Sequence, residues 1–222
     1  MSSSNFKHAL FNQFARVGKA LSNGNRLELL EFLAQGERSV DDLAGISGLS
    51  VANTSQHLQL LRQSGLVSSR KEGLKVYYKV SNNDVIELLS KLRNVAELEL
   101  AEVNLLVNSY LTVKDNLEPI AREELLKRVT DGLVTVIDVR PGEEFIAGHV
   151  PGAINIPLSE LHKHLDELES GLEIVAYCRG PHCILAFNAV AELRKLGLKA
   201  RRLEDGYPEW KQAGLPIEST NS

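Results

Sequence analysis

The sequence predicts two domains, a mainly helical one followed by an α/β one with a parallel sheet. Up to about residue 112 apolar residues recur with the helical period, and beyond it strand-like apolar runs alternate with helical segments. The charge changes at the same place: residues 1–112 carry 12 basic and 11 acidic residues (net +1), and residues 113–222 carry 13 and 18 (net −5). A chain of 222 residues suits two ordinary domains. We expect them to meet at TVKDNLEP (112–119), whose Glu-Pro pair disfavours helix.

Periodic apolar residues and capping residues organise the first half. They predict helices over residues 6–21, 23–36, 39–48, 50–65 and 84–111. Asn23 or Asn25 would open the second of these helices, while Ser39 and Ser50 would cap the third and the fourth. The first half is therefore predicted to be mainly α.

Two short helices followed by a hairpin predict a winged helix-turn-helix. The helices are separated by a Gly-containing turn, and the β-prone runs LVSSR and KVYYKV flank Glu72-Gly73. The segment LAGISGLSVANTSQHLQLLRQSGLVSSRKEGLKVYYKV resembles the ArsR family of bacterial repressors, most closely in SQHLQLLRQSGLV and in the aromatic pair of the hairpin. The resemblance covers residues 6–111 and implies a dimeric DNA-binding protein.

The helix over 50–65 is the expected DNA reader. Val51, Leu58 and Leu61 would face the core, which leaves polar side chains free to meet base edges, and Val51 or Ala52 could touch a thymine methyl group. Residues 62–79 carry five basic residues against one acidic residue, which offers a positive surface to phosphate oxygens. The alternative is an ordinary solvated helix and hairpin. The residues expected at a double-stranded DNA operator are Ser50, Val51, Ala52, Asn53, Ser55, Gln56, Arg70, Lys71 and Lys75.

The helix predicted over 84–111 is too apolar on too many sides to stand alone in water. Members of the ArsR family are dimers whose first and last helices pair, so we expect a homodimer through helices near 5–21 and 84–111. The alternative is that the second domain covers this face. The sequence departs from metal- and redox-sensing members, because its first half has no cysteine and residues 58–148 contain neither His nor Cys. This DNA reader lacks a sensor of its own.

Beyond the expected linker, strands and helices alternate. LVTVIDV (133–139) and LEIVAY (172–177) are continuous apolar runs, typical of strands buried on both faces of a parallel sheet. ILAFNAVAELRKLG (184–197) predicts a helix, KARRLE (199–204) a strand, and YPEWKQAG (207–214) a short helix. This order predicts an α/β domain.

Three ordered motifs of this half resemble the rhodanese superfamily. VIDVRPGEEFIAGHVPGAINIPLSEL (136–161) and LEDGYPEWKQAGLPI (203–217) resemble its signatures, and YCRGPHC takes the active-site position. The resemblance covers residues 118–218. It implies a rhodanese-like domain that carries sulfane sulfur as a persulfide on Cys178.

The chemistry is expected in one short loop before a helix. Cys178 follows a buried strand, and the N–H groups at the start of the next helix can hold a thiolate, a persulfide or an oxyanion. Cys183 is either a second thiol that attacks a persulfide on Cys178 or a small buried filler. Arg179 would add positive charge, while Asp138, Arg140 and His149 would brace the loop. The full active-site loop comprises Cys178, Arg179, Gly180, Pro181, His182 and Cys183.

Other chemistry fits this loop less well. Two cysteines with His182 between them would make a cramped zinc site, so we expect no metal and no cofactor. A phosphate or arsenate loop of the form Cys-x5-Arg would need arginine where this chain has Ile184. With no apolar run of membrane-span length and no signal peptide, we expect a cytoplasmic protein without membrane contact. A structural disulfide is disfavoured in that reducing compartment.

These observations give one leading function and two alternatives. The leading one is a dimeric transcriptional regulator, a repressor, whose rhodanese domain senses or transfers sulfane sulfur through Cys178. Its small-molecule partner would be a sulfane-sulfur donor or a thiol acceptor. The first alternative is a thiosulfate-type sulfurtransferase enzyme whose DNA reader only localises it or autoregulates its expression. The second is an arsenate reductase, supported only by the repressor family's association with arsenic.

Overall fold

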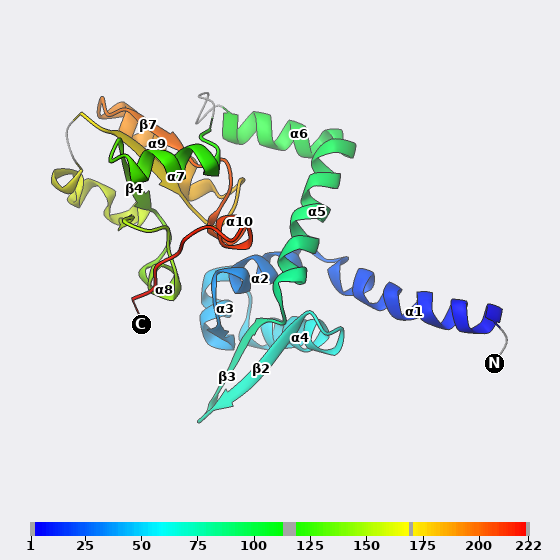
Figure 1. The fold of residues 1–222 in the computed structure, drawn as a ribbon. Helices are drawn as coiled ribbons and strands as arrows, with labels where there is room; N and C mark the ends of the chain where they lie inside the picture. Colours follow the sequence, from blue (N-terminus) through cyan, green and yellow to red (C-terminus); the bar gives the residue numbers. More distant parts are fainter. Residues whose placement is uncertain (1–2, 113–118, 169–170, 221–222) are drawn as a thin grey trace. The chain divides into compact units, whose positions relative to one another are not determined.

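The computed structural model describes residues 3–112, 119–168 and 171–220 (Figure 1). The chain divides into two compact units, Met1–Leu89 and Ser90–Ser222. Most of the expected linker, residues 112–119, lies outside the described residues, so the predicted domain boundary stays a prediction. Over the described ranges, no helix is both long enough and apolar enough to cross a membrane.

The first unit is helical with a small antiparallel wing, as predicted. Its core is built by α2, α3, α4 and the hairpin, and Leu29, Leu58 and Leu61 are fully buried there. β1 pairs with β3, which pairs with β2, so the hairpin lies on one side of the helices (Figure 1). The elements are α1 (Ser3–Leu21), α2 (Gly24–Gln35), β1 (Arg38–Ser39), α3 (Val40–Ser47), α4 (Val51–Gln63), β2 (Val67–Glu72) and β3 (Lys75–Val80).

Local capping sets the starts of these helices. The side chains of Asn23, Ser39 and Ser50 each accept a hydrogen bond from a backbone N–H in the first turn of α2, α3 and α4. At α3 the pairing is reciprocal, since the Asp42 carboxylate accepts from the backbone N–H of Ser39. This is a capping box, and it satisfies two N–H groups that a helix start leaves unpaired.

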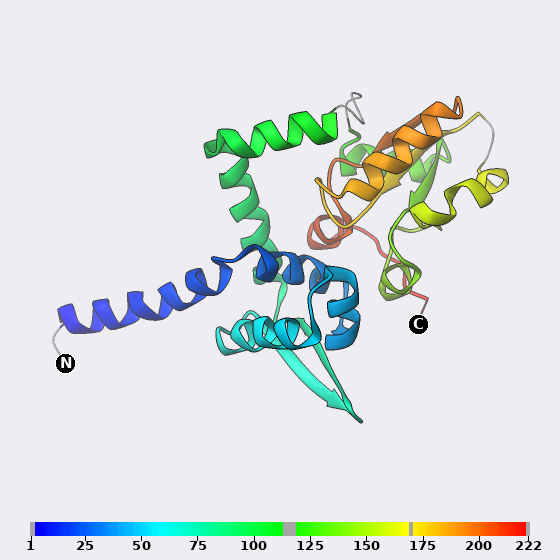
Figure 2. The same cartoon turned by 180° about the vertical axis from the view of Figure 1, so that it is seen from behind.

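The predicted single helix over 84–111 is broken. α5 (Asn83–Glu99) ends before Leu100, α6 (Ala101–Val107) follows in a new direction, and a π-helical turn occupies Asn108–Thr112 (Figure 2). The expectation of one continuous helix was therefore wrong. Leu100 has an extended backbone and makes no side-chain cap bond. Neither proline nor glycine stands at the break. Apolar side chains remain exposed along both helices, including Val95, Leu98 and Leu105.

The second unit contains the predicted α/β domain with a parallel sheet. The sheet has the order β5-β4-β6-β7, and all its pairings are parallel. Figure 2 shows α9 running along one face of this sheet. The elements are α7 (Arg122–Thr130), β4 (Val134–Asp138), α8 (Gly142–Ala147), β5 (Ile154–Asn155), β6 (Glu173–Tyr177), α9 (Ile184–Lys195), β7 (Ala200–Arg202) and α10 (Tyr207–Gln212), with 3-10 turns over Leu158–Lys163 and Leu165–Glu167.

Alternate residues of the central strands enter two separate cores. Ile137, Ile174 and Ala176 pack against α9, whereas Val136 and Val175 pack with Trp210 and the α7 side. The strands are thus buried on both faces, which explains why their sequences are continuously apolar instead of alternating. Cys178, immediately after β6, joins the core on the α9 side. The fold therefore delivers this thiol to the carboxyl edge of the sheet.

Candidate functional site: a DNA-reading surface and a cysteine loop

The face of α4 opposite the core carries the expected base-reading residues. Ala52, Asn53 and Gln56 are exposed, and Ser55 is half-buried. Val51 is 51% exposed, so the prediction that it faces the core was wrong. Thr54, Leu58 and Leu61 are the buried residues of this helix, and they set a core direction that the first-turn Val51 does not share. Its exposure instead leaves the valine methyl groups open to a thymine methyl.

Sequence reasoning missed one member of this surface. Gln59 follows Gln56 by three residues and is exposed on the same side of α4. Its amide donates to the Ser55 hydroxyl at 3.4 Å, which ties together two polar side chains of the outward face. Ala52, Gln56 and Gln59 follow one another at intervals of four and three residues, the spacing of one helix face, and this was the signal that could have identified Gln59.

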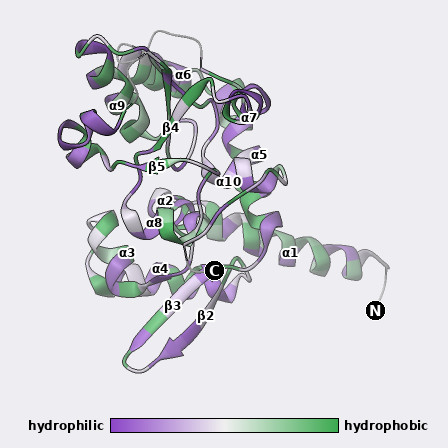
Figure 3. Cartoon of the chain, turned by 60° about the vertical axis from the view of Figure 1, so that its left-hand side comes forward, coloured by the Kyte–Doolittle hydropathy of each residue, from purple (hydrophilic) through white to green (hydrophobic). Residues whose placement is uncertain are grey.

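The wing presents its basic residues unequally. Lys71 and Lys75 lie exposed at the tip of the β2–β3 hairpin, whose β2 strand is hydrophilic in Figure 3. Arg70 is engaged, because its Nε and Nη2 atoms donate to the Glu37 carboxylate at 2.8 and 2.6 Å and its guanidinium lies over the Tyr77 ring. The two lysines are therefore freer than Arg70 to meet DNA phosphates.

The two cysteines of the chain face each other in the loop after β6. The turn closes with the Cys183 N–H donating to the Gly180 carbonyl at 3.1 Å, which brings the two Cα atoms to 6.1 Å. Cys178 and Cys183 are joined as a disulfide. The sequence disfavoured a structural disulfide, but this bond is also the one that forms if Cys183 attacks sulfur on Cys178, which is one of the two roles expected for Cys183. Cys178 is 1% exposed and Cys183 is half-buried at the N-cap of α9.

A close backbone contact holds this loop from the other side. The Tyr207 N–H donates to the Cys178 carbonyl at 3.0 Å. Next to it, Gly206 lies so close that an added Cβ would stand 2.3 Å from the Gly180 nitrogen and 2.4 Å from its Cα. Only glycine fits at position 206, so the LEDGYPEW motif packs directly on the cysteine loop.

Arg179 points to a carboxylate that sequence reasoning missed. Its Nε donates to both Glu144 oxygens at 3.0 and 3.1 Å, and its Nη2 donates to Oε1 at 2.7 Å. The Glu144 side chain is fully buried in α8, so this pair anchors the loop to that helix. The guanidinium charge is thus shared with a carboxylate. Nothing in the local sequence distinguishes Glu144 from Glu143, because the contact spans 35 residues.

The predicted bracing residues form a buried network beneath the loop. Arg140 donates from Nε to Asp138 at 2.9 Å and from Nη2 to the Gly148 carbonyl at 2.8 Å, and the Asp138–Arg140 pair is fully buried. Burial lowers the pKa of Arg140, but the hydrogen bond and the charge of Asp138 together raise it by more than burial lowers it, so the net shift is upward. His149 stacks on Phe145, with ring centroids 3.6 Å apart. These residues order the segment between β4 and β5.

Two buried tyrosines complete this network. The Cζ atom of Arg140 lies over the rings of Tyr177 and Tyr207, 5.5 and 4.3 Å from their centroids. The Tyr177 hydroxyl accepts a hydrogen bond from the Val150 N–H at 3.1 Å. Burial, and then the charge of Asp138, raise the pKa of Tyr177 well above its usual value. Both tyrosines therefore stay neutral and act as packing groups.

A winged helix-turn-helix joined to a parallel α/β domain with a cysteine loop defines a DNA-binding regulator with an appended thiol domain. Comparison with known proteins identifies both parts. Residues 23–69 match the bacterial regulatory protein arsR family, and residues 121–213 match the rhodanese-like domain. The chain belongs to the ArsR-family transcriptional regulators that carry a C-terminal rhodanese-like domain.

One similar protein matches nearly the whole chain, and others match only its DNA-reading half. The HTH-type transcriptional regulator Rv0324 of Mycobacterium tuberculosis is 47% identical over 96% of this chain and 93% of its own length. The transcriptional activator HlyU of Vibrio cholerae is 44% identical, over 33% of this chain and 71% of its own. Among solved structures, the homodimeric winged helix-turn-helix domain Mb0332 of Mycobacterium bovis (fragment 1–100) is 44% identical. It covers 45% of this chain and 93% of its own length, with a TM-score of 0.42.

Proposed function

We propose that this protein is an operator-binding repressor whose affinity for DNA follows the sulfur state of Cys178. The observation that carries the proposal is the placement of the thiols. The chain has two cysteines, and both lie in one loop of the rhodanese-like domain, within bonding distance of each other. The DNA-reading half has none, so any thiol-based signal must begin at residues 178–183.

The proposed sulfur chemistry uses both cysteines. The Cys178 thiolate attacks the sulfane sulfur of a donor, forms a persulfide, and releases a shorter polysulfide or hydrosulfide when the donor is a polysulfide, or sulfite when the donor is thiosulfate. The Cys183 thiolate then attacks the Sγ atom of Cys178, which forms the Cys178–Cys183 disulfide and releases hydrosulfide. A dithiol reductant restores both thiols and is itself oxidised to a disulfide. The product of this second step would pair the same two cysteines that are joined in the structure.

The proposed DNA-binding form is a homodimer. In α1, Phe6, Phe11 and Phe14 are each more than half exposed, and the rings of Phe11 and Phe14 meet edge to face with their centroids 5.7 Å apart. In α5, Val95 and Leu98 are also exposed. These apolar side chains lie on α1 and α5, within the two segments expected to pair, where a second copy can bury them. A dimer also places two copies of α4 on a two-fold symmetric operator.

The test is operator binding by the full-length protein before and after polysulfide treatment, with mass spectrometry of the peptide that contains residues 178–183. We expect polysulfide to lower operator affinity while the peptide acquires first a persulfide and then a disulfide. Cys178→Ser should abolish both changes, whereas Cys183→Ser should stop at the persulfide and release no hydrosulfide. Equal DNA affinity for reduced, persulfidated and Cys178→Ser protein would instead favour a sulfurtransferase that merely shares its chain with a DNA reader.

The sign of regulation needs its own measurement, because the named relatives include an activator. A promoter fused to a reporter, with and without the protein, separates the two signs. We expect higher transcription without it. Lower transcription would overturn repression and leave DNA binding intact.

The base-reading assignment is tested by binding-site selection. Gln56→Ala and Gln59→Ala should each relax the preferred sequence at one base pair, because an amide side chain discriminates a base edge by about 1–3 kcal/mol. Lys79→Ala on the exposed wing is the matched control and should leave the preferred sequence unchanged. Unaltered preference in both glutamine variants would contradict base reading by this face.

A further inference from the structure

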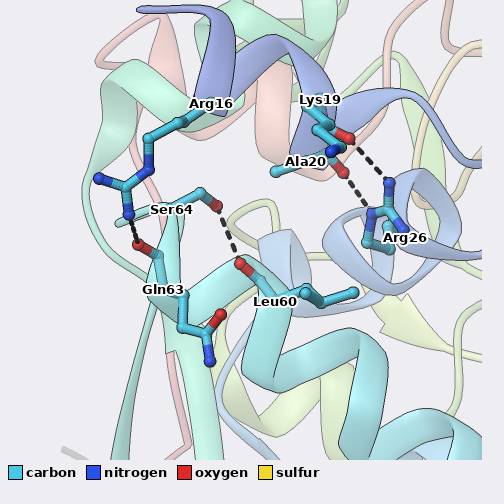
Figure 4. A pocket seen from close by; sticks show the side chains of 7 residues that line it. All are labelled: Arg16, Lys19, Ala20, Arg26, Leu60, Gln63 and Ser64. Atoms are coloured by element: carbon cyan, nitrogen blue, oxygen red, sulfur yellow. Dashed lines mark hydrogen bonds between the residues drawn. The ribbon is translucent and has the colours of Figure 1, made fainter. Parts of the chain in front are cut away.

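A cavity of about 290 Å³ opens in the first unit. It lies where the end of α1, the start of α2 and the end of α4 meet (Figure 4). None of its lining residues is acidic, and three are cationic. The lining consists of Arg16, Lys19, Ala20, Arg26, Leu60, Gln63 and Ser64.

The cations of this cavity are positioned by the backbone. Arg26 donates from Nη2 to the Lys19 carbonyl at 2.9 Å and from Nε to the Ala20 carbonyl, which caps the end of α1. Arg16 donates from Nη2 to the Gln63 carbonyl at 3.2 Å, across from α1 to α4. The Lys19 ammonium has no hydrogen-bond or ion-pair partner within the described part of the chain. Positive charge is thus concentrated here, and no carboxylate among the described residues forms an ion pair with it.

We propose that this cavity binds a small organic anion with a phosphate or sulfonate head and a short apolar part. Guanidinium and ammonium groups are the side chains that recognise such oxyanions. Leu60, which is partly exposed, and Ala20 supply the apolar wall, and the Ser64 hydroxyl adds a polar group beside them. The volume is at the lower end for small-molecule sites, which limits the ligand to a few carbon atoms beyond its head group.

The site is separate from the proposed dimer face. A helix turns by about 100° per residue, so Arg16 and Phe14 point about 160° apart around α1. Burying Phe14 against a second copy therefore leaves Arg16 open. Because the cavity touches both α1 and the end of α4, an occupant would restrain the reading helix against the proposed dimer helix. The proposal does not depend on any chemistry at Cys178.

Calorimetric titration of the full-length protein with butyl phosphate tests the proposal. At low ionic strength we expect saturable one-to-one binding per chain that weakens as salt is added, with inorganic phosphate binding less tightly and 1-butanol not at all. Lys19→Ala and Arg16→Gln should each weaken butyl phosphate about tenfold, equivalent to about 1.4 kcal/mol. Lys7→Ala, a lysine of the same helix outside the cavity, is the matched control and should bind as the wild type does.

Three results would overturn the proposal. One is the absence of butyl phosphate binding to the wild type at millimolar concentration. Another is unchanged binding in both Lys19→Ala and Arg16→Gln, with thermal unfolding confirming that the variants are folded. The third is a tenfold loss of operator affinity in these variants without any anion binding by the wild type, which would make the cavity a contact for the DNA backbone. Arg26 is left unchanged because its removal would also uncap α1.

Discussion

Replacing Gly206 by alanine should displace the cysteine loop without touching a thiol. The new Cβ would stand 2.3 Å from the Gly180 nitrogen and 2.4 Å from the Arg179 carbonyl carbon, and real Cβ contacts are not shorter than 3.0 Å. All the obstructing atoms are backbone, so no side chain can swing aside. The segment after Cys178 must therefore move away from the LEDGYPEW motif, and the bond from the Tyr207 N–H to the Cys178 carbonyl must lengthen with it.

The cost has a stability part and a reactivity part. Overpacking a well-packed interior costs about 1–3 kcal/mol, and a purely backbone clash places Gly206→Ala near about 3 kcal/mol. A nucleophile misplaced by about 1 Å can lose about 100-fold in rate, so persulfide loading of Cys178 should slow by one to two orders of magnitude. The two effects come from the same displacement and should appear together.

Urea unfolding and the rate of persulfide loading from polysulfide measure the two parts. Gly142→Ala is the control, because its Cβ would lie 3.5 Å from the Asn155 side chain, an ordinary contact. The control should change stability by no more than about 0.5 kcal/mol. A Gly206→Ala protein with the unfolding midpoint and loading rate of the wild type would refute the view that this contact holds the loop.

Three further predictions concern stability and DNA binding. Asp138→Ala should lower the free energy of unfolding by about 3–5 kcal/mol, because it leaves Arg140 buried without its carboxylate. The double variant Asp138→Leu with Arg140→Met should recover most of this loss in urea unfolding, and equal losses would contradict the argument. Ser39→Ala removes the N-cap acceptor of α3 and should cost about 1 kcal/mol in thermal unfolding, whereas an unchanged midpoint would deny the cap a role. Lys71→Ala with Lys75→Ala removes four lysines from the proposed dimer, so it should weaken all duplexes alike and reduce the slope of log affinity against log salt by about 3.6. An unchanged slope would remove both lysines from the phosphate contacts.

Local signals predicted most of the elements, because the physics that forms them is local. Ser39 and Ser50 cap the helices that the sequence assigned to them, since an N-cap bond involves residues only three apart. The continuous apolar runs became strands with both faces buried. The break at Leu100 was not predictable from the same signals, because no proline, glycine or capping side chain marks it.

The features that sequence reasoning missed depend on distant contacts. Glu144 meets Arg179 across 35 residues, and Gly206 meets Gly180 across a tertiary packing contact. Neither pair carries a local pattern. The phase of α4 failed for a related reason: a helix buries only the side chains that its neighbours cover, and those neighbours stop short of Val51.

The chemistry of the cysteine loop sets an upper limit on the regulation it can deliver. A sulfur modification shifts operator affinity only by the difference in its stabilising effect on the DNA-bound and free forms. A tenfold change requires about 1.4 kcal/mol. Ordering the backbone of one residue costs about 1–2 kcal/mol, so a change in the order of one or two loop residues is large enough. Closing the Cys178–Cys183 disulfide constrains the four residues between the cysteines, whereas a persulfide on Cys178 leaves them unconstrained. If the two states act on DNA through loop order, the disulfide and the persulfide should therefore differ in operator affinity from each other, as well as from the reduced protein.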